Sequence, residues 1–168
     1  SKAASREFDQ ALANYVKSRR WFRSKARSTV AVSLQDAIPV SQGESAVWLV
    51  LAQVDFRQGD PETYCLPLAL ASGDEAHKLE QHTPQAIVAR TRMAEGGAEG
   101  VLYDGVYGKA FPNALLDLLS RRKELPGNVG VLRSWPERQL RQEPTKSDLA
   151  GTVSSAEQSN TSLLFGNE

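Results

Sequence analysis

Helical spacing of apolar residues marks the first twenty positions of the chain. Four apolar side chains fall on one face of a helix, and basic residues gather near its end, where they complement the helix dipole. The pattern predicts an amphipathic helix from Ser5 to about Arg20. Its apolar face is made of Phe8, Leu12, Tyr15 and Val16.

Alternation of apolar and polar positions, typical of β-strands, follows the helix. Polar turn sequences such as SQGES and RQGDP separate the apolar stretches, so we expect neighbouring strands to run antiparallel. Pro67 cannot donate a backbone hydrogen bond, which predicts an edge position or a bulge for its strand. Residues 71–83 are polar and mixed, and we expect a loop there. The predicted strands cover residues 30–34, 46–56, 64–70, 85–91 and 101–106.

The last third of the chain begins with a second helical pattern. Pro112 stands where a first helical turn tolerates proline, and the helix is expected to run for about three turns. Residues 133–148 are charged and proline-bearing, which predicts a linker or a surface loop. Residues 151–156 and 161–165 are β-prone and flank a polar turn. The apolar face of the second helix is made of Phe111, Leu115, Leu118 and Leu119.

The order of these elements indicates an α+β fold with mostly antiparallel sheet. A glycine-rich stretch, AEGGAEG, contains Gly96, Gly97 and Gly100 and predicts a hinge between two subdomains. We therefore expect one subdomain over residues 1–97 and a second over residues 98–168.

Composition narrows the functional classes. Among the 168 residues, twenty basic side chains balance twenty acidic ones, so net charge gives no attraction toward nucleic acid or a membrane surface. Cys65 is the single cysteine, which excludes an internal disulfide and a thiol cluster for zinc or iron–sulfur. No stretch is apolar enough for a membrane span or a signal peptide. We expect a soluble, cytoplasmic protein.

The stretch RRWFRSKAR, Arg19 to Arg27, places five cations around two aromatic residues. Such interleaving can bind nucleic acid through phosphate contacts and base stacking, or the stretch can belong to a protein-binding module. The favoured interpretation is structural: Trp21 and Phe22 are buried where the helix meets the first strand, and the cations bond carbonyls, pair with acids or stay solvated.

Three other polar groups carry weaker signals. His77 and His82 are five residues apart with no third ligand in view, which favours solvated loop histidines over a metal site. Cys65, in a predicted strand and with no histidine placed near it, is expected to be a small buried residue rather than a nucleophile. We assign no catalytic residue and no metal ligand.

The terminal turn is the strongest candidate site. Hydroxyl and amide side chains together with successive backbone N–H groups could face the β- and γ-phosphates of a nucleotide. The turn lacks the GK[ST] ending of a Walker loop and the glycines of the protein-kinase loop. The candidate residues are Gln158, Ser159, Asn160, Thr161 and Ser162.

Several stretches together resemble the N-terminal region of bacterial maltokinases, including those fused to a trehalose synthase module. The most specific is EQSNTSLLFG; RRWFRSKAR, TYCLPLAL and EGVLYDGVYGKAFPNALLDLL are looser. The resemblance implies an N-terminal cap of residues 1–97, in which a curved antiparallel sheet packs on a helix, followed by the start of a kinase-like N-lobe. It places residues 158–162 on the loop that covers the phosphates of ATP.

The resemblance also implies a parent enzyme that transfers the γ-phosphoryl of ATP to maltose, for trehalose and glycogen metabolism, with ATP and Mg²⁺ as cofactors. The phosphate-binding lysine, the catalytic aspartate and the Mg²⁺ ligands of the family lie beyond Glu168, so we expect a fragment that is inactive alone and binds neither cofactor. Expected partners are the C-terminal kinase lobe and, in a fusion, the synthase module. The cap is expected to stiffen the N-lobe or to dock a partner; no nucleic acid or membrane is expected.

Overall fold

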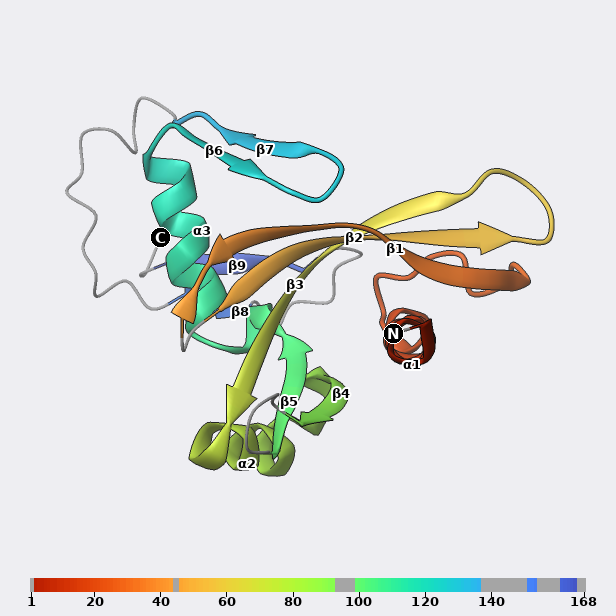
Figure 1. Ribbon diagram of the computed structural model, residues 1–168, viewed down its shortest axis with the longest axis horizontal. Helices are drawn as coiled ribbons and strands as arrows, with labels where there is room; N and C mark the ends of the chain where they lie inside the picture. Colours follow the sequence, from red (N-terminus) through yellow and green to blue (C-terminus); the bar gives the residue numbers. More distant parts are fainter. Residues whose placement is uncertain (1, 44–45, 93–98, 137–150, 154–160, 166–168) are drawn as a thin grey trace.

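The computed structural model describes residues 2–43, 46–92, 99–136, 151–153 and 161–165 (Figure 1). Within them the chain has an α+β fold around a curled antiparallel sheet of five strands in the order β1-β2-β3-β5-β4, which confirms the predicted class. The strands are β1 (Thr29–Ser41), β2 (Val47–Phe56), β3 (Glu62–Ser72), β4 (Ile87–Arg92) and β5 (Glu99–Asp104).

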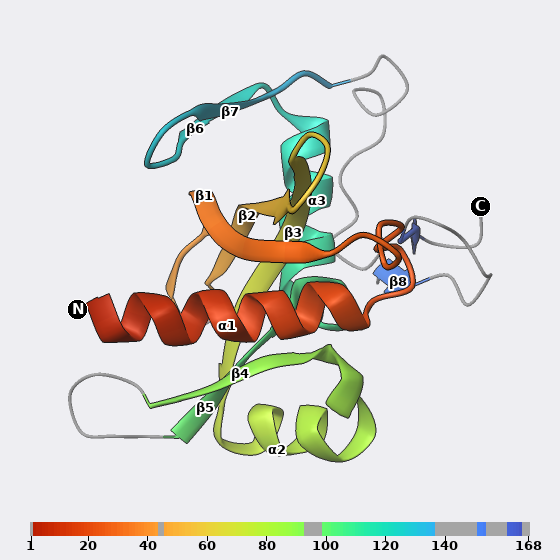
Figure 2. The same ribbon diagram turned by 90° about the vertical axis from the view of Figure 1, so that its right-hand side faces the viewer.

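The N-terminal helix α1 (Lys2–Ser18) lies against the two edge strands of this sheet. In Figure 2 it runs between β1 on one side and β4 on the other, so the sheet curls around it. Leu12 and Val16 are fully buried, which confirms the predicted apolar face. The helix ends where the Ser18 hydroxyl donates a hydrogen bond of 2.6 Å to the Tyr15 carbonyl.

The two faces of the sheet bury separate apolar clusters. One cluster lies between α1 and the first three strands and includes Phe22, Val50 and Leu68. The other includes Ala71, Tyr103 and Phe111 and lies under two further helices, α2 (Gly73–His82) and α3 (Ala110–Ser120). Because each face has its own core, the sheet is a scaffold that holds helices on both sides.

The expected loop over residues 71–83 is wrong, because most of this segment forms helix α2. The helix buries only Ala76 and Leu79, so its apolar face is too short to stand out in the sequence. Asp74 and Glu75 in its first turn favour the positive end of the helix dipole. The helix then leads through a 3₁₀ turn, η2 (Pro84–Ala86), into β4.

The expectation that the strand of Pro67 is an edge strand or carries a bulge there is wrong. The strand is central, and its register with β2 runs through Pro67 without a shift. Pairing with β5 begins only at Leu68, so among the described strands Pro67 lies where β3 is bonded to β2 alone. The missing N–H is tolerated because this half of the strand has a local edge.

After β5 the chain forms a 3₁₀ turn, η3 (Gly105–Tyr107), and then α3, which confirms the predicted second helix with Pro112 buried in its first turn. A hairpin of β6 (Lys123–Pro126) and β7 (Val131–Ser134) follows, so part of the expected linker is a strand. Its four-residue strands are too short for alternation to be recognised. The remaining pair, β8 (Gly151–Val153) and β9 (Leu163–Phe165), is antiparallel.

The predicted hinge falls largely on residues 93–98, outside the described residues. The boundary between residues 97 and 98 stays a prediction. Strand β5, which follows it, is hydrogen-bonded between β3 and β4 in the five-stranded sheet. No helix in the described part of the chain is long and apolar enough to cross a membrane.

Candidate functional site

An open groove of about 680 Å³ lies between β3, α3 and β9. Its walls are mostly apolar, with Trp21 and Leu66 contributed by the cap side and Phe111 and Leu115 by the first half of α3. The groove brings together segments that are far apart in the sequence. The first half of β3, residues 62–67, which does not pair with β5, faces α3 across it. Thr161, a described residue of the predicted phosphate loop, lines this groove.

Of the five residues predicted to contact phosphate, the structure describes two. Thr161 is exposed and lines the groove, and Ser162 is half-buried beside it. Gln158, Ser159 and Asn160 lie outside the described residues. The described strands on either side of the turn are paired, with Gly151 opposite Phe165 and Val153 opposite Leu163.

Cys65 points into this groove and is exposed, so its predicted burial is wrong. The reason is again the first half of β3, which no strand of the described chain covers on the side of α3. The protein around the groove mouth still removes water from the thiol and raises its pKa. The thiol is therefore protonated at neutral pH, which does not suit a nucleophile.

Asp104, which lines the groove, is hydrogen-bonded to the buried residue Tyr15. The Tyr15 hydroxyl donates to Asp104 Oδ2 at 2.6 Å, and the Val106 N–H donates to Asp104 Oδ1 at 3.1 Å. Burial raises the pKa of Asp104, since only 3 % of the residue is exposed. Both oxygens have partners, so the pair ties α1 to the end of β5 instead of offering a free base.

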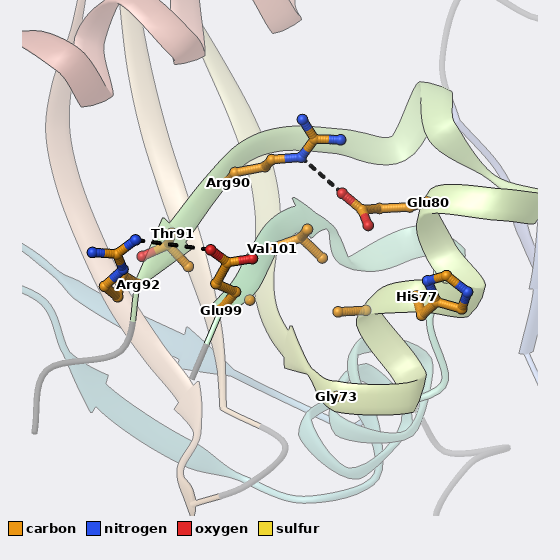
Figure 3. Close-up of a pocket in the computed structure, with 10 residues that line it drawn as sticks. Gly73, His77, Glu80, Arg90, Thr91, Arg92, Glu99 and Val101 are labelled. Atoms are coloured by element: carbon orange, nitrogen blue, oxygen red, sulfur yellow. Dashed lines mark hydrogen bonds and ion pairs between the residues drawn. The ribbon is translucent and has the colours of Figure 1, made fainter. Parts of the chain in front are cut away.

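A second cleft, of about 780 Å³, opens between α2 and the β4–β5 pair (Figure 3). Two ion pairs cross or border it: Glu80 with Arg90 at 2.8 Å and Arg92 with Glu99 at 3.8 Å. His77 stands at its other end, within 2.7 Å of the Gln81 amide. The charges are mutually compensated and largely exposed, so the cleft has no strong preference for one sign of ligand.

The two histidines lie on α2 and not in the expected loop, although both are exposed as predicted. Among the residues that the structure describes, no three His, Cys, Asp or Glu side chains come together as a possible metal site.

The basic and aromatic stretch after α1 is engaged within the protein at both ends. The Arg27 guanidinium donates to Glu62 Oε1 at 2.8 Å and to the Gln58 carbonyl at 3.1 Å, and it lies 3.5 Å from the centre of the Phe56 ring. Arg19 donates to the Gln85 carbonyl at 2.8 Å. These contacts support the structural interpretation of the stretch.

The two aromatic residues of the same stretch differ in burial. Phe22 is 2 % exposed, as predicted, whereas Trp21 is only half-buried and borders the groove. Each ring centre lies 5.5 Å from that of Tyr64. The hydroxyl of Tyr64 donates to Glu62 at 2.5 Å, and this bond, followed by those from Ser24 and Arg27, lowers the pKa of Glu62.

Sequence reasoning missed two buried acids, Asp36 and Asp104. Asp36 lies within a strand of mainly apolar or small residues and Asp104 ends another, which is the signal that could have identified them as bonded interior groups.

The comparison with known families agrees with this architecture. The model of the maltokinase N-terminal cap domain matches residues 15–107, more than half of the chain. The match begins at Tyr15 within α1, covers the whole five-stranded sheet and α2, and ends with η3. The chain therefore belongs to the maltokinase N-terminal cap domain family.

Proposed function

We propose that the chain is the cap and the first part of the kinase-like N-lobe of a cytoplasmic maltokinase. The enzyme would transfer the γ-phosphoryl of ATP to maltose, in trehalose and glycogen metabolism. The observation that carries the proposal is the family match over residues 15–107. The candidate phosphate loop, residues 158–162, follows in the sequence between the paired strands β8 and β9.

The loop of residues 158–162 would cover the phosphates of bound ATP. Its donors fit this role: Thr161 is exposed at the groove rim, and hydroxyl, amide and backbone N–H groups all donate to phosphate oxygens. Bound ATP would supply the phosphoryl group, and Mg²⁺ would neutralise its charge. On this proposal, the Mg²⁺ ligands would belong to the C-terminal kinase lobe.

The cap would act as scaffold for this loop. The sheet has a core on each face, and Asp104, Glu62 and Arg27 are bonded to neighbours within the protein. Side chains that are hydrogen-bonded in this way stabilise the fold and are not available to bind a substrate. Docking of a fused trehalose synthase module is a further role that the exposed surface allows.

Two preparations test the proposal. The chain of 168 residues, mixed with ATP, Mg²⁺ and maltose, is expected to form no maltose 1-phosphate, because phosphoryl transfer needs the acceptor, the metal and the loop in one closed site. The full-length protein that carries this chain is expected to form it. Turnover by the 168-residue chain alone would contradict the proposal, as would a full-length protein that phosphorylates no maltose.

A further inference from the structure

Asp36 is a carboxylate that is only 4 % exposed, in a strand that otherwise buries apolar residues. The pairing of β1 with β2 shifts register between Leu34 and Asp36, which marks a bulge. A bulge moves the side-chain alternation by one residue. Ala37 therefore packs against the core under α1, while Asp36 faces the β6–β7 hairpin, which lies on the other side of β1 (Figure 2).

The turn of this hairpin, residues 127–130, closes around the carboxylate. Asp36 Oδ1 accepts from the N–H groups of Asn128 at 2.6 Å and Val129 at 3.2 Å, and Oδ2 accepts from Gly130 at 2.8 Å. The N–H of Ala37 donates to Oδ1 at 2.8 Å. Successive backbone N–H groups of this kind form a cradle for an anion, here filled by a side chain of the protein itself.

Gly127 leaves room for the Asp36 carboxylate within the turn because it has no side chain. A Cβ atom at this position would lie 2.5 Å from Oδ2 and 2.6 Å from Oδ1 of Asp36. At Gly130 the same atom would lie 3.4 Å from Oδ2, an ordinary contact. The two glycines of one turn thus differ sharply in what they tolerate.

We propose that Asp36 is the latch that fixes the β6–β7 hairpin to the cap sheet, so that the segment after α3 moves with the cap as one body. An isolated two-stranded hairpin is marginally stable in water, so its position depends on such contacts. The latch joins residues 92 to 94 positions apart in the sequence and reaches beyond the family match that ends at residue 107. This inference does not rest on the proposed function.

The latch is closed throughout the neutral range. Burial opposes ionisation of Asp36, but the N–H groups of Gly130, Asn128, Val129 and Ala37 outweigh it and hold the pKa of the carboxyl below its usual value. A depressed pKa contributes stability above the usual range of an aspartate, and that contribution is lost only as the pH falls through the lowered pKa. The device is therefore a permanent brace and not a pH switch.

Amide hydrogen exchange of the 168-residue chain at neutral pH tests the latch. Asp36→Asn removes the charge and one acceptor, and Gly127→Ala blocks the carboxylate without changing charge. In both variants, exchange at Asn128, Val129 and Gly130 is expected to rise about tenfold or more, the scale of losing charge-assisted hydrogen bonds. Amides of the central strand β2 report whether the fold persists, since the release is expected to be local.

Two matched variants serve as controls. Gly130→Ala changes the same turn where the added Cβ makes an ordinary contact, and Asp60→Asn removes an exposed carboxylate in another turn. Both are expected to exchange like the unmodified chain. Protection at residues 128–130 that stays within a factor of about two in Asp36→Asn and Gly127→Ala would overturn the proposal. Equal loss of protection in β2 and in the hairpin would also overturn it, because the hairpin would then have no separate attachment.

Discussion

Tyr15→Phe is the most informative single change for the cap, because it removes one oxygen from a buried pair. The ring and its contact with Arg19, at 4.5 Å from the ring centre, stay in place. Asp104 loses the donor at 2.6 Å and keeps only the Val106 N–H described at its other oxygen. Leaving a buried acceptor without its donor costs about 1–3 kcal/mol, so we expect the free energy of unfolding to fall by that amount at pH 7.

The loss is expected to depend on pH. Burial raises the pKa of Asp104, and the Tyr15 hydroxyl partly opposes this effect, so Tyr15→Phe raises that pKa further. A raised aspartate pKa means that the folded state binds the proton more readily than the unfolded state. Stability is then lost as the pH rises from the unfolded value through the folded one. The variant is therefore expected to lose more stability at pH 7 than at pH 4.

Urea denaturation followed by tryptophan fluorescence at the two pH values measures both effects. Tyr107→Phe is the matched control, since Tyr107 is 38 % exposed, and it is expected to change the free energy of unfolding by less than about 0.5 kcal/mol. Asp104→Asn in the same background is expected to remove the pH dependence. A Tyr15→Phe chain that is as stable as the unmodified chain at pH 7, or that loses more stability at pH 4, would refute the reasoning.

Three other predictions follow from named contacts. The pKa of Glu62 is lowered, chiefly by the Tyr64 hydroxyl, so its contribution to stability is present above the usual glutamate range and is lost as the pH falls through the lowered pKa. Glu62→Gln is expected to flatten the acid side of the curve of unfolding free energy against pH, and an unchanged curve would contradict this. Cys65 is exposed, so a maleimide is expected to label the folded chain, slowly because the thiol pKa is raised; labelling only in urea would show the groove to be closed. Arg19 and Arg27 are held within the protein, so single-stranded DNA is expected to show no binding that falls steeply with salt, and a steep dependence would favour the nucleic-acid alternative.

The sequence predicted the elements whose signal is long. Helix α1 repeats its apolar period over several turns, strand β2 is a ten-residue run rich in apolar residues, and both lie where expected. Helix α2 and the β6–β7 hairpin were missed because two buried residues and four-residue strands leave almost no periodicity. Cys65 was misjudged because its exposure depends on where β5 stops pairing with β3, which is a property of the register between strands.

The contacts that organise the cap were out of reach for a different reason. Tyr15 and Asp104 are 89 positions apart, and Asp36 meets a turn more than 90 positions away. Neither contact belongs to a local sequence motif, because each depends on how α1 and the hairpin are placed against the folded sheet. The candidate phosphate loop was recognised by resemblance, and its residues 158–160 lie outside the described part of the chain.

We propose that this chain contributes a phosphate-covering loop to a kinase while its cap sheet serves as scaffold. The most direct measurement is the KM for ATP and for maltose of the full-length enzyme carrying Ser159→Ala and Thr161→Ala, with Ser5→Ala on the exposed side of α1 as control. We expect the KM for ATP to rise about tenfold, the scale of losing polar contacts to a charged phosphate, with an unchanged KM for maltose and an unchanged control. An ATP dependence identical to that of the unmodified enzyme would contradict it.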